Sequence, residues 1–176
     1  YYNSDQKKFL NNISKKYNFE FIFNKINQIK KLKVLLIGET IIDQYVFGEV
    51  LGKSGKEPHL VLTEEKRKNY LGGAAAIANH LSAFCKTVNF LTLIGENNDN
   101  LDFIKSSLKK NVKVKFFSKK NSPTIIKKRF IDNVSKNKLL GVYSINDEKL
   151  QKNLELKLIS NIKKHASSCD LILISD

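Results

Sequence analysis

Apolar and polar positions along this chain follow two rhythms, and their order predicts an α/β protein. Short aliphatic or alternating segments predict strands at 33–38, 41–51, 59–64, 88–94, 112–117, 124–131, 139–143 and 170–176. Apolar residues spaced three or four apart predict helices at about 5–31, 74–84, 98–109 and 148–165. Because strands and helices alternate, the expected fold is a doubly wound, mainly parallel sheet. Ligands of such sheets bind at the carboxyl ends of the strands.

Two regions depart from this alternation. Segments 41–51 and 59–64 are joined by a polar turn and predict a hairpin, in a small sheet that stands apart from the main one. Residues 1–31 precede the first strong strand, and we expect them to form a helical linker or N-terminal extension. Residues 32–176 would then form the domain that carries the function.

Composition limits the class of protein. The chain has 176 residues, 41% of them hydrophobic, and no apolar run approaches the ~20 residues of a membrane helix. Two cysteines, Cys85 and Cys169, and three scattered histidines form no metal or redox motif, which favours a cytoplasmic protein. The chain contains no methionine, so we expect it to be a fragment of a longer protein.

The net charge of +14 has two interpretations. It can indicate an acidic partner, such as nucleic acid or a phosphorylated metabolite. It can also reflect lysines that fill solvated faces. The lysines are spread along the chain and do not form one block interleaved with aromatics, which favours the second interpretation and leaves a nucleic-acid-binding module as an alternative.

Two motifs could carry chemistry at strand ends. Asp43 follows the first predicted strand, and its carboxylate could accept hydrogen bonds from sugar hydroxyls or could simply cap a turn. Gly72 and Gly73 precede a helix, where they would allow close approach of a ligand to backbone N–H groups or of one element to another. Neither a P-loop nor a dinucleotide fingerprint is present.

A third candidate lies in the predicted strand 124–131. Lys127 and Arg129 share one face, and Lys128 points to the other. Two cations on one face could hold a phosphate, although a solvated sheet face would have the same pattern.

Taken in order, these segments resemble the ribokinase-like (PfkB) carbohydrate kinases. Residues 38–45 (Gly-Glu-Thr-Ile-Ile-Asp-Gln-Tyr) are similar to the family's N-terminal substrate motif, and residues 72–79 to its di-glycine helix motif. Residues 91–96 resemble the strand that follows it. Residues 122–129 resemble the Pro-Thr-x-x-Lys-x-Arg segment of heptose-phosphate kinases, including the kinase domains of bifunctional kinase–nucleotidyltransferases. The resemblance covers about 32–176.

The resemblance implies a role for each motif. Asp43, Gly72 and Gly73 would bind sugar hydroxyls, and Lys127 and Arg129 would approach a substrate phosphate. The hairpin at about 41–64 would be a lid over the sugar and, as in relatives, a contact in a homodimer. Lys53 and Lys56 on its turn could help to hold an anionic sugar.

The chain also departs from the family pattern. Relatives usually place a sugar-binding asparagine where Ala76 stands, and Asn79, about one helical turn on, could substitute for it. The family's catalytic aspartate and nucleotide-binding strands would lie beyond residue 176. ATP and Mg²⁺ are therefore expected cofactors of the full-length enzyme, whereas this fragment would supply sugar binding and have no kinase activity alone.

Three alternatives remain open. The first is a kinase for another sugar or for a nucleoside. The second is the basic nucleic-acid-binding module, and the third is a degenerate homologue in which Ala76 marks lost sugar binding. If the chain is part of a sugar kinase, no nucleic-acid or membrane partner is expected.

Overall fold

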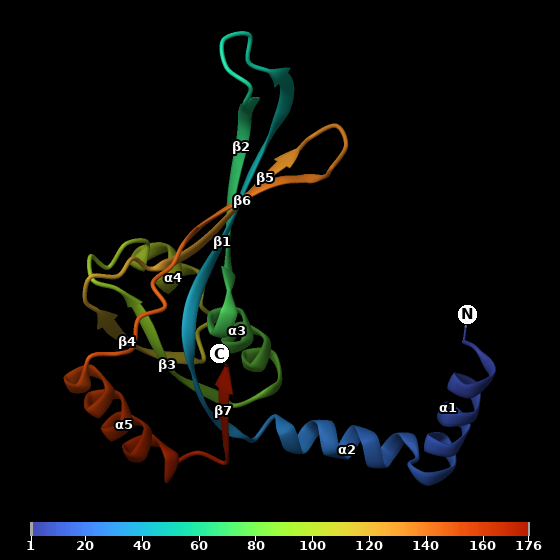
Figure 1. Ribbon diagram of the computed structural model, residues 1–176. Helices are drawn as coiled ribbons and strands as arrows, with labels where there is room; N and C mark the ends of the chain where they lie inside the picture. Colours follow the sequence, from blue (N-terminus) through green and yellow to red (C-terminus); the bar gives the residue numbers. More distant parts are fainter. Residues whose placement is uncertain (1, 176) are drawn as a thin grey trace.

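A single long strand organises the computed structural model, which describes residues 2–175 (Figure 1). This strand, β1 (Lys33–Lys53), pairs first with β3 (Thr87–Gly95) and β7 (Leu171–Ser175), both parallel to it. From residue 41 onward it pairs instead with β2 (Leu60–Gly72), antiparallel, and with β5 (Ile125–Asp132), parallel. One strand thus belongs to two sheets.

The central sheet has the strand order β4-β3-β1-β7, with β4 (Val112–Lys119) at one edge and every pair parallel. Alternate side chains of β1 point to opposite faces. Leu36 packs with the alanines of α3 (Gly73–Phe84), and Leu35 packs toward α5 (Lys152–Ala166). The predicted doubly wound α/β architecture is confirmed for these elements.

A short helix, α4 (Leu101–Ser107), completes the cover near the point where β1 changes partners. Its buried Ile104 packs against Ile42 of β1 and Ile94 of β3. This helix is shorter than the predicted one, 98–109. It begins at Leu101 because Asn100, directly before it, adopts a left-handed backbone conformation.

The distal sheet consists of β2, the second part of β1, β5 and β6 (Lys138–Ser144), in the order β2-β1-β5-β6. In Figure 1 it rises away from the helices. The predicted hairpin is confirmed, because β1 and β2 pair antiparallel on either side of the turn. It is longer than predicted and continuous with the central sheet, because β1 runs through both sheets and β2 runs on to Gly72. Polar Thr40 does not interrupt β1, since its buried hydroxyl bonds that of Thr92 at 2.8 Å.

The N-terminal extension forms two helices, α1 (Ser4–Lys16) and α2 (Phe19–Ile29), where the sequence predicted one helical stretch. The break occurs because Tyr17 is extended and the Asn18 side chain accepts from the Phe21 N–H, which starts a new helix. Neither helix buries a residue, and both extend away from the sheets (Figure 1).

The cysteines are free thiols in this structure. Cys85 is buried, and burial raises the pKa of its thiol. Within residues 2–175, no cluster of three metal-ligating side chains occurs. None of the helices in the same range combines the length and the apolar character that spanning a bilayer requires.

Candidate functional site

The face of the distal sheet that carries Asp43 is the candidate site. In the strand register, Asp43 lies opposite Lys127 of β5 and Tyr70 of β2, and Tyr45 lies opposite Arg129 and Lys68. Directly opposite residues of a sheet project to the same face. We call this surface the binding face; it comprises Asp43, Tyr45, Phe47, Lys66, Lys68, Tyr70, Lys127, Arg129 and Tyr143.

An ion pair lies at the centre of the binding face. Arg129 donates from Nη1 to Asp43 Oδ1, and the two side chains are 20% and 27% exposed. This hydrogen bond raises the pKa of the Arg129 guanidinium. The structure therefore brings together two residues that the sequence had placed on separate motifs.

Aromatic rings surround this pair. The Arg129 guanidinium carbon lies 5.5 Å from the centre of the Tyr45 ring and 5.8 Å from that of Tyr143. Both distances are within the range of cation–π attraction. Lys127 Nζ lies 5.9 Å from the Tyr143 ring centre, so the second cation of the segment reaches the same surface.

Gly72 and Gly73 are each required to be glycine for a different steric reason. A Cβ on Gly72 would collide with Asp43 Oδ2, so glycine is needed for the carboxylate to lie over the backbone. Gly73 has φ +52°, and a Cβ there would lie 2.8 Å from the Glu39 carbonyl oxygen. The di-glycine turn thus makes room for a carboxylate and for the β1 backbone at the start of α3.

An open pocket of about 330 Å³ is lined by Asp43, Tyr45, Phe47 and Tyr70. The Tyr45 ring meets Tyr70 edge-on at 5.8 Å between centres and stacks with Phe47 at 6.2 Å. A carboxylate among aromatic walls suits a ligand that has both C–H faces and hydroxyl groups. The cations next to it suit a ligand that also carries negative charge.

The side-chain amide of Asn79 bonds backbone groups at the end of α4. Its Nδ2 donates to the Ser107 carbonyl at 2.9 Å, and its Oδ1 accepts from the Lys109 N–H at 3.0 Å. Both ends of the amide thereby join α3 to the end of α4. Ala76 and Asn79 line another pocket, of about 270 Å³, that shares Tyr70 with the first. Asn79 thus lies beside Ala76 in a pocket next to the one that Asp43 lines.

Lys53 and Lys56 lie away from Asp43. Lys53 ends β1, ten residues beyond Asp43, which corresponds to about 33 Å of strand. Lys56 is exposed in the turn that follows, where its N–H bonds the Ser54 hydroxyl. In Figure 1 this turn is the far tip of the distal sheet.

Several residues of the binding face were not among the sequence candidates. Tyr70 and Tyr143 come from β2 and β6, and Lys66 and Lys68 alternate along β2. The alternation of side chains along a strand predicts which residues of that strand share a face. The register that brings the four strands together was not available from the sequence.

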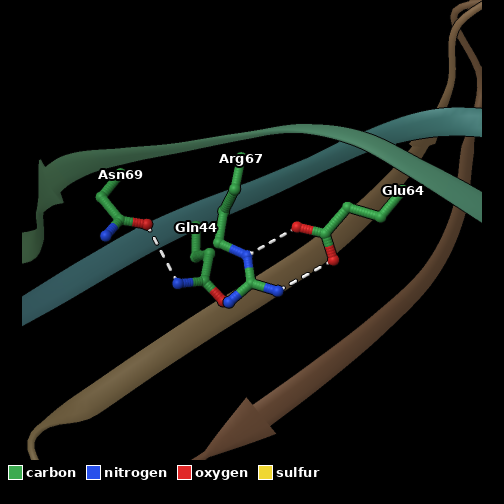
Figure 2. A network of polar contacts seen from close by, with 4 residues as sticks. All are labelled: Gln44, Glu64, Arg67 and Asn69. Carbon is green, nitrogen blue, oxygen red and sulfur yellow. Dashed lines mark hydrogen bonds and ion pairs between the residues drawn. The ribbon is translucent and has the colours of Figure 1, made fainter.

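The opposite face of the distal sheet carries a different polar group (Figure 2). Arg67 donates from Nε and Nη2 to the two carboxylate oxygens of Glu64, at 2.9 and 2.8 Å. Gln44 Nε2 donates to Asn69 Oδ1 at 3.0 Å. Lys128 lies opposite Gln44, so it points away from Lys127 and Arg129, as the alternation predicted.

Comparison with curated proteins shows relatives among heptose kinases. The chain is 27% identical over 146 residues to a bifunctional protein HldE from Nitratiruptor sp., covering 83% of this chain and 31% of the relative. It is 28% identical over 104 residues to a D-beta-D-heptose 7-phosphate kinase from Bordetella bronchiseptica, covering 59% and 33%. No protein-family model matches the chain.

Solved structures show the same fold. A possible 1-phosphofructokinase from Thermotoga maritima superposes with a TM-score of 0.58 at 14% identity, covering 81% of this chain and 44% of that one. Ribokinase from Arabidopsis thaliana, solved with ribose and ATP, gives 0.52 at 17% identity, covering 82% and 45%. The chain spans about a third of the length of the curated relatives and under half of these solved chains.

These comparisons confirm the resemblance to ribokinase-like carbohydrate kinases. The chain is related in sequence to heptose 7-phosphate kinases and has part of the ribokinase-like α/β fold.

Proposed function

From the ribokinase-like fold, we propose that this chain is the substrate-binding portion of an ATP-dependent kinase that phosphorylates a hydroxyl of a sugar. A phosphorylated sugar of the heptose type fits best. The observation that supports this substrate most strongly is the Asp43–Arg129 pair in a face with four cations and aromatic walls. The carboxylate suits hydroxyls, and the cations suit a phosphate.

In this proposal the residues of the binding face orient the sugar. Asp43 Oδ2, which has no protein donor among residues 2–175, accepts from sugar hydroxyls. Lys127 and Arg129 bind the phosphate that the sugar already carries. Tyr45, Tyr70 and the rest of the distal sheet cover the sugar and exclude water, which limits hydrolysis of the phosphoryl donor.

The phosphoryl transfer itself needs groups that we expect beyond residue 176. An aspartate would take the proton from the sugar hydroxyl, and Mg·ATP would supply the phosphoryl group. The present chain would therefore bind the sugar phosphate without turnover. A phosphoryl-transfer assay on the purified 176-residue chain should show only background, and turnover above background would contradict this part of the proposal.

A binding screen tests the substrate. Calorimetric titrations would compare a heptose 7-phosphate, the unphosphorylated heptose, ribose and a nucleoside. The proposal expects the sugar phosphate to bind most tightly. Tighter binding of ribose or of the nucleoside would favour a kinase for that substrate instead.

A nucleic-acid-binding module is the second candidate because the net charge is +14. It predicts retention on nucleic acid that weakens steeply with salt. Single-stranded and duplex oligonucleotides in the same titrations separate the two functions. Affinity above that for the sugar phosphate at physiological salt would favour the nucleic-acid module.

We also propose a homodimer through the distal sheet. Its surface exposes Leu60 and Leu140, which line an apolar hollow of about 390 Å³ near the tip. An apolar surface of this kind favours a protein contact. Light scattering should give twice the chain mass, and Leu140→Lys should give the monomer. A wild-type monomer at high concentration would contradict the dimer.

A further inference from the structure

Arg129 is held from two sides by neighbouring strands. Tyr45 belongs to β1 and Tyr143 to β6, and these two strands flank β5, which carries Arg129. The ring centres lie 5.5 and 5.8 Å from the guanidinium carbon. The planar guanidinium stacks well on aromatic faces, so two rings limit its position more than an extended side chain alone would.

Among the described residues 2–175, one nitrogen of Arg129 has a protein acceptor. Within residues 2–175, Nη1 donates to Asp43 Oδ1 and weakly, at 3.5 Å, to the carbonyl oxygen of Lys127. Nη2 and Nε bond no acceptor in this part of the chain. A guanidinium has five N–H donors, so an edge of Arg129 stays available for a second anion.

We propose that Tyr45 and Tyr143 are positioning residues that hold Arg129 as a bridge between Asp43 and an anionic group of the ligand. The inference rests on the proposed function and adds that one side chain links binding of the ligand's hydroxyl groups to binding of its anionic group. The same guanidinium orients the hydroxyl acceptor and binds the anion. A ligand with both hydroxyls and an anion is therefore preferred to a ligand with only one of them.

The chain offers a direct spectroscopic test because it has two arginines, Arg67 and Arg129. With ¹⁵N-labelled arginine, two Nε–Hε signals are expected, and Arg67→Lys assigns them. Inorganic phosphate is the titrant. The Arg129 signal should shift with saturation. The Arg67 signal should stay in place because both its Nε and its Nη2 already bond Glu64.

Variants at the two tyrosines then separate positioning from simple packing. Tyr143→Phe keeps the ring, and the phosphate Kd from the Arg129 signal should stay within about twofold of wild type. Tyr143→Leu removes the ring, and the Kd should rise by roughly two- to tenfold. Tyr45→Phe and Tyr45→Leu should behave in the same way. Far-UV circular dichroism and the urea midpoint check that each variant is folded.

Several outcomes would overturn the bridge. They are an unchanged Kd in the folded leucine variants, equal losses in the phenylalanine and leucine variants, or joint movement of both arginine signals. Binding of a heptose 7-phosphate without a shift at Arg129 would overturn the bridge and leave the proposed substrate intact. A phosphate-induced shift at Arg129 without binding of any heptose would support the bridge and contradict the proposed substrate.

Discussion

The two faces of the distal sheet each carry one arginine–carboxylate pair, and the pairs differ in exposure, in hydrogen-bond geometry and in surroundings. Arg67 and Glu64 are exposed, at 50% and 41%, and join through two nitrogens and both carboxylate oxygens. Arg129 and Asp43 are less exposed, at 20% and 27%, use one nitrogen and one oxygen, and lie among aromatic rings.

The Glu64 carboxylate therefore has both oxygens bonded by Arg67, whereas the Asp43–Arg129 pair still has hydrogen-bonding groups that a ligand could use. In the exposed pair, Nε and Nη2 of Arg67 donate to the two oxygens of Glu64, so each oxygen of that carboxylate already accepts from a protein donor. The Asp43–Arg129 pair keeps an acceptor oxygen and an edge of N–H donors without a protein partner among residues 2–175, and it lies beside an open pocket. Charge alone does not separate the two faces, whereas unused hydrogen-bonding capacity beside a pocket favours the face of Asp43 as the candidate site.

The largest expected effect on ligand affinity comes from replacing Arg129, with replacement of Arg67 as the comparison. Arg129→Gln removes a charge-assisted contact to the phosphate and releases Asp43. Affinity for a heptose 7-phosphate should fall by roughly 10- to 100-fold, as expected for about 1.5–3 kcal/mol. Arg67→Gln is the matched control and should stay within about twofold of wild type. Equal losses in the two variants, measured by calorimetry, would remove the distinction between the faces.

A smaller effect is expected from a single methyl group at Gly72. Gly72→Ala places a Cβ against Asp43 Oδ2, so the carboxylate must move away from the hydroxyl position. We expect about a tenfold loss of affinity, comparable to one displaced hydrogen bond. The control is Gly55→Ala in the turn of the distal sheet, where a Cβ would meet nothing within 4 Å. A Gly72→Ala chain that binds as tightly as wild type would show that the ligand does not use this oxygen.

The smallest effect concerns the pH dependence of the exposed pair. The hydrogen bond from Arg67 lowers the pKa of Glu64 below its ordinary value. Its contribution to folding is thus present above the pKa of the unfolded chain and is lost as the pH falls through the lowered folded value. Urea midpoints of wild type and Glu64→Gln should differ slightly at neutral pH and converge in acid. A gap that widens in acid would contradict this sign.

The central sheet could be predicted from the sequence because its signals are local. The aliphatic residues from Val34 to Ile37 form a short continuous run, as is typical of a strand buried on both faces. The alanines of α3 allow close packing on the sheet and also lie in one short segment. The distal sheet was only half predicted. Its strands are polar on both faces for part of their length, so hydrophobic period did not give the length of β2 or the pairing of β1 with β5.

The candidate site shows the same division. Asp43, Gly72 and Arg129 were found from motifs, and the fold brings them together. Their mutual contact could not be predicted, since it depends on a parallel register between segments far apart in the chain. The partners of the Asn79 amide at the end of α4 could not be predicted either, since they depend on how α3 packs beside α4. The roles of these residues toward a ligand stay predictions.

The most direct measurement is a calorimetric titration of a heptose 7-phosphate into the wild-type chain, Asp43→Asn and Glu64→Gln. Asparagine keeps the size of Asp43 and removes the charge that pairs with Arg129 and accepts from hydroxyls. The account predicts binding by wild type and Glu64→Gln with the same Kd within about twofold, and at least a tenfold loss in Asp43→Asn. Equal affinity in Asp43→Asn and wild type would contradict it.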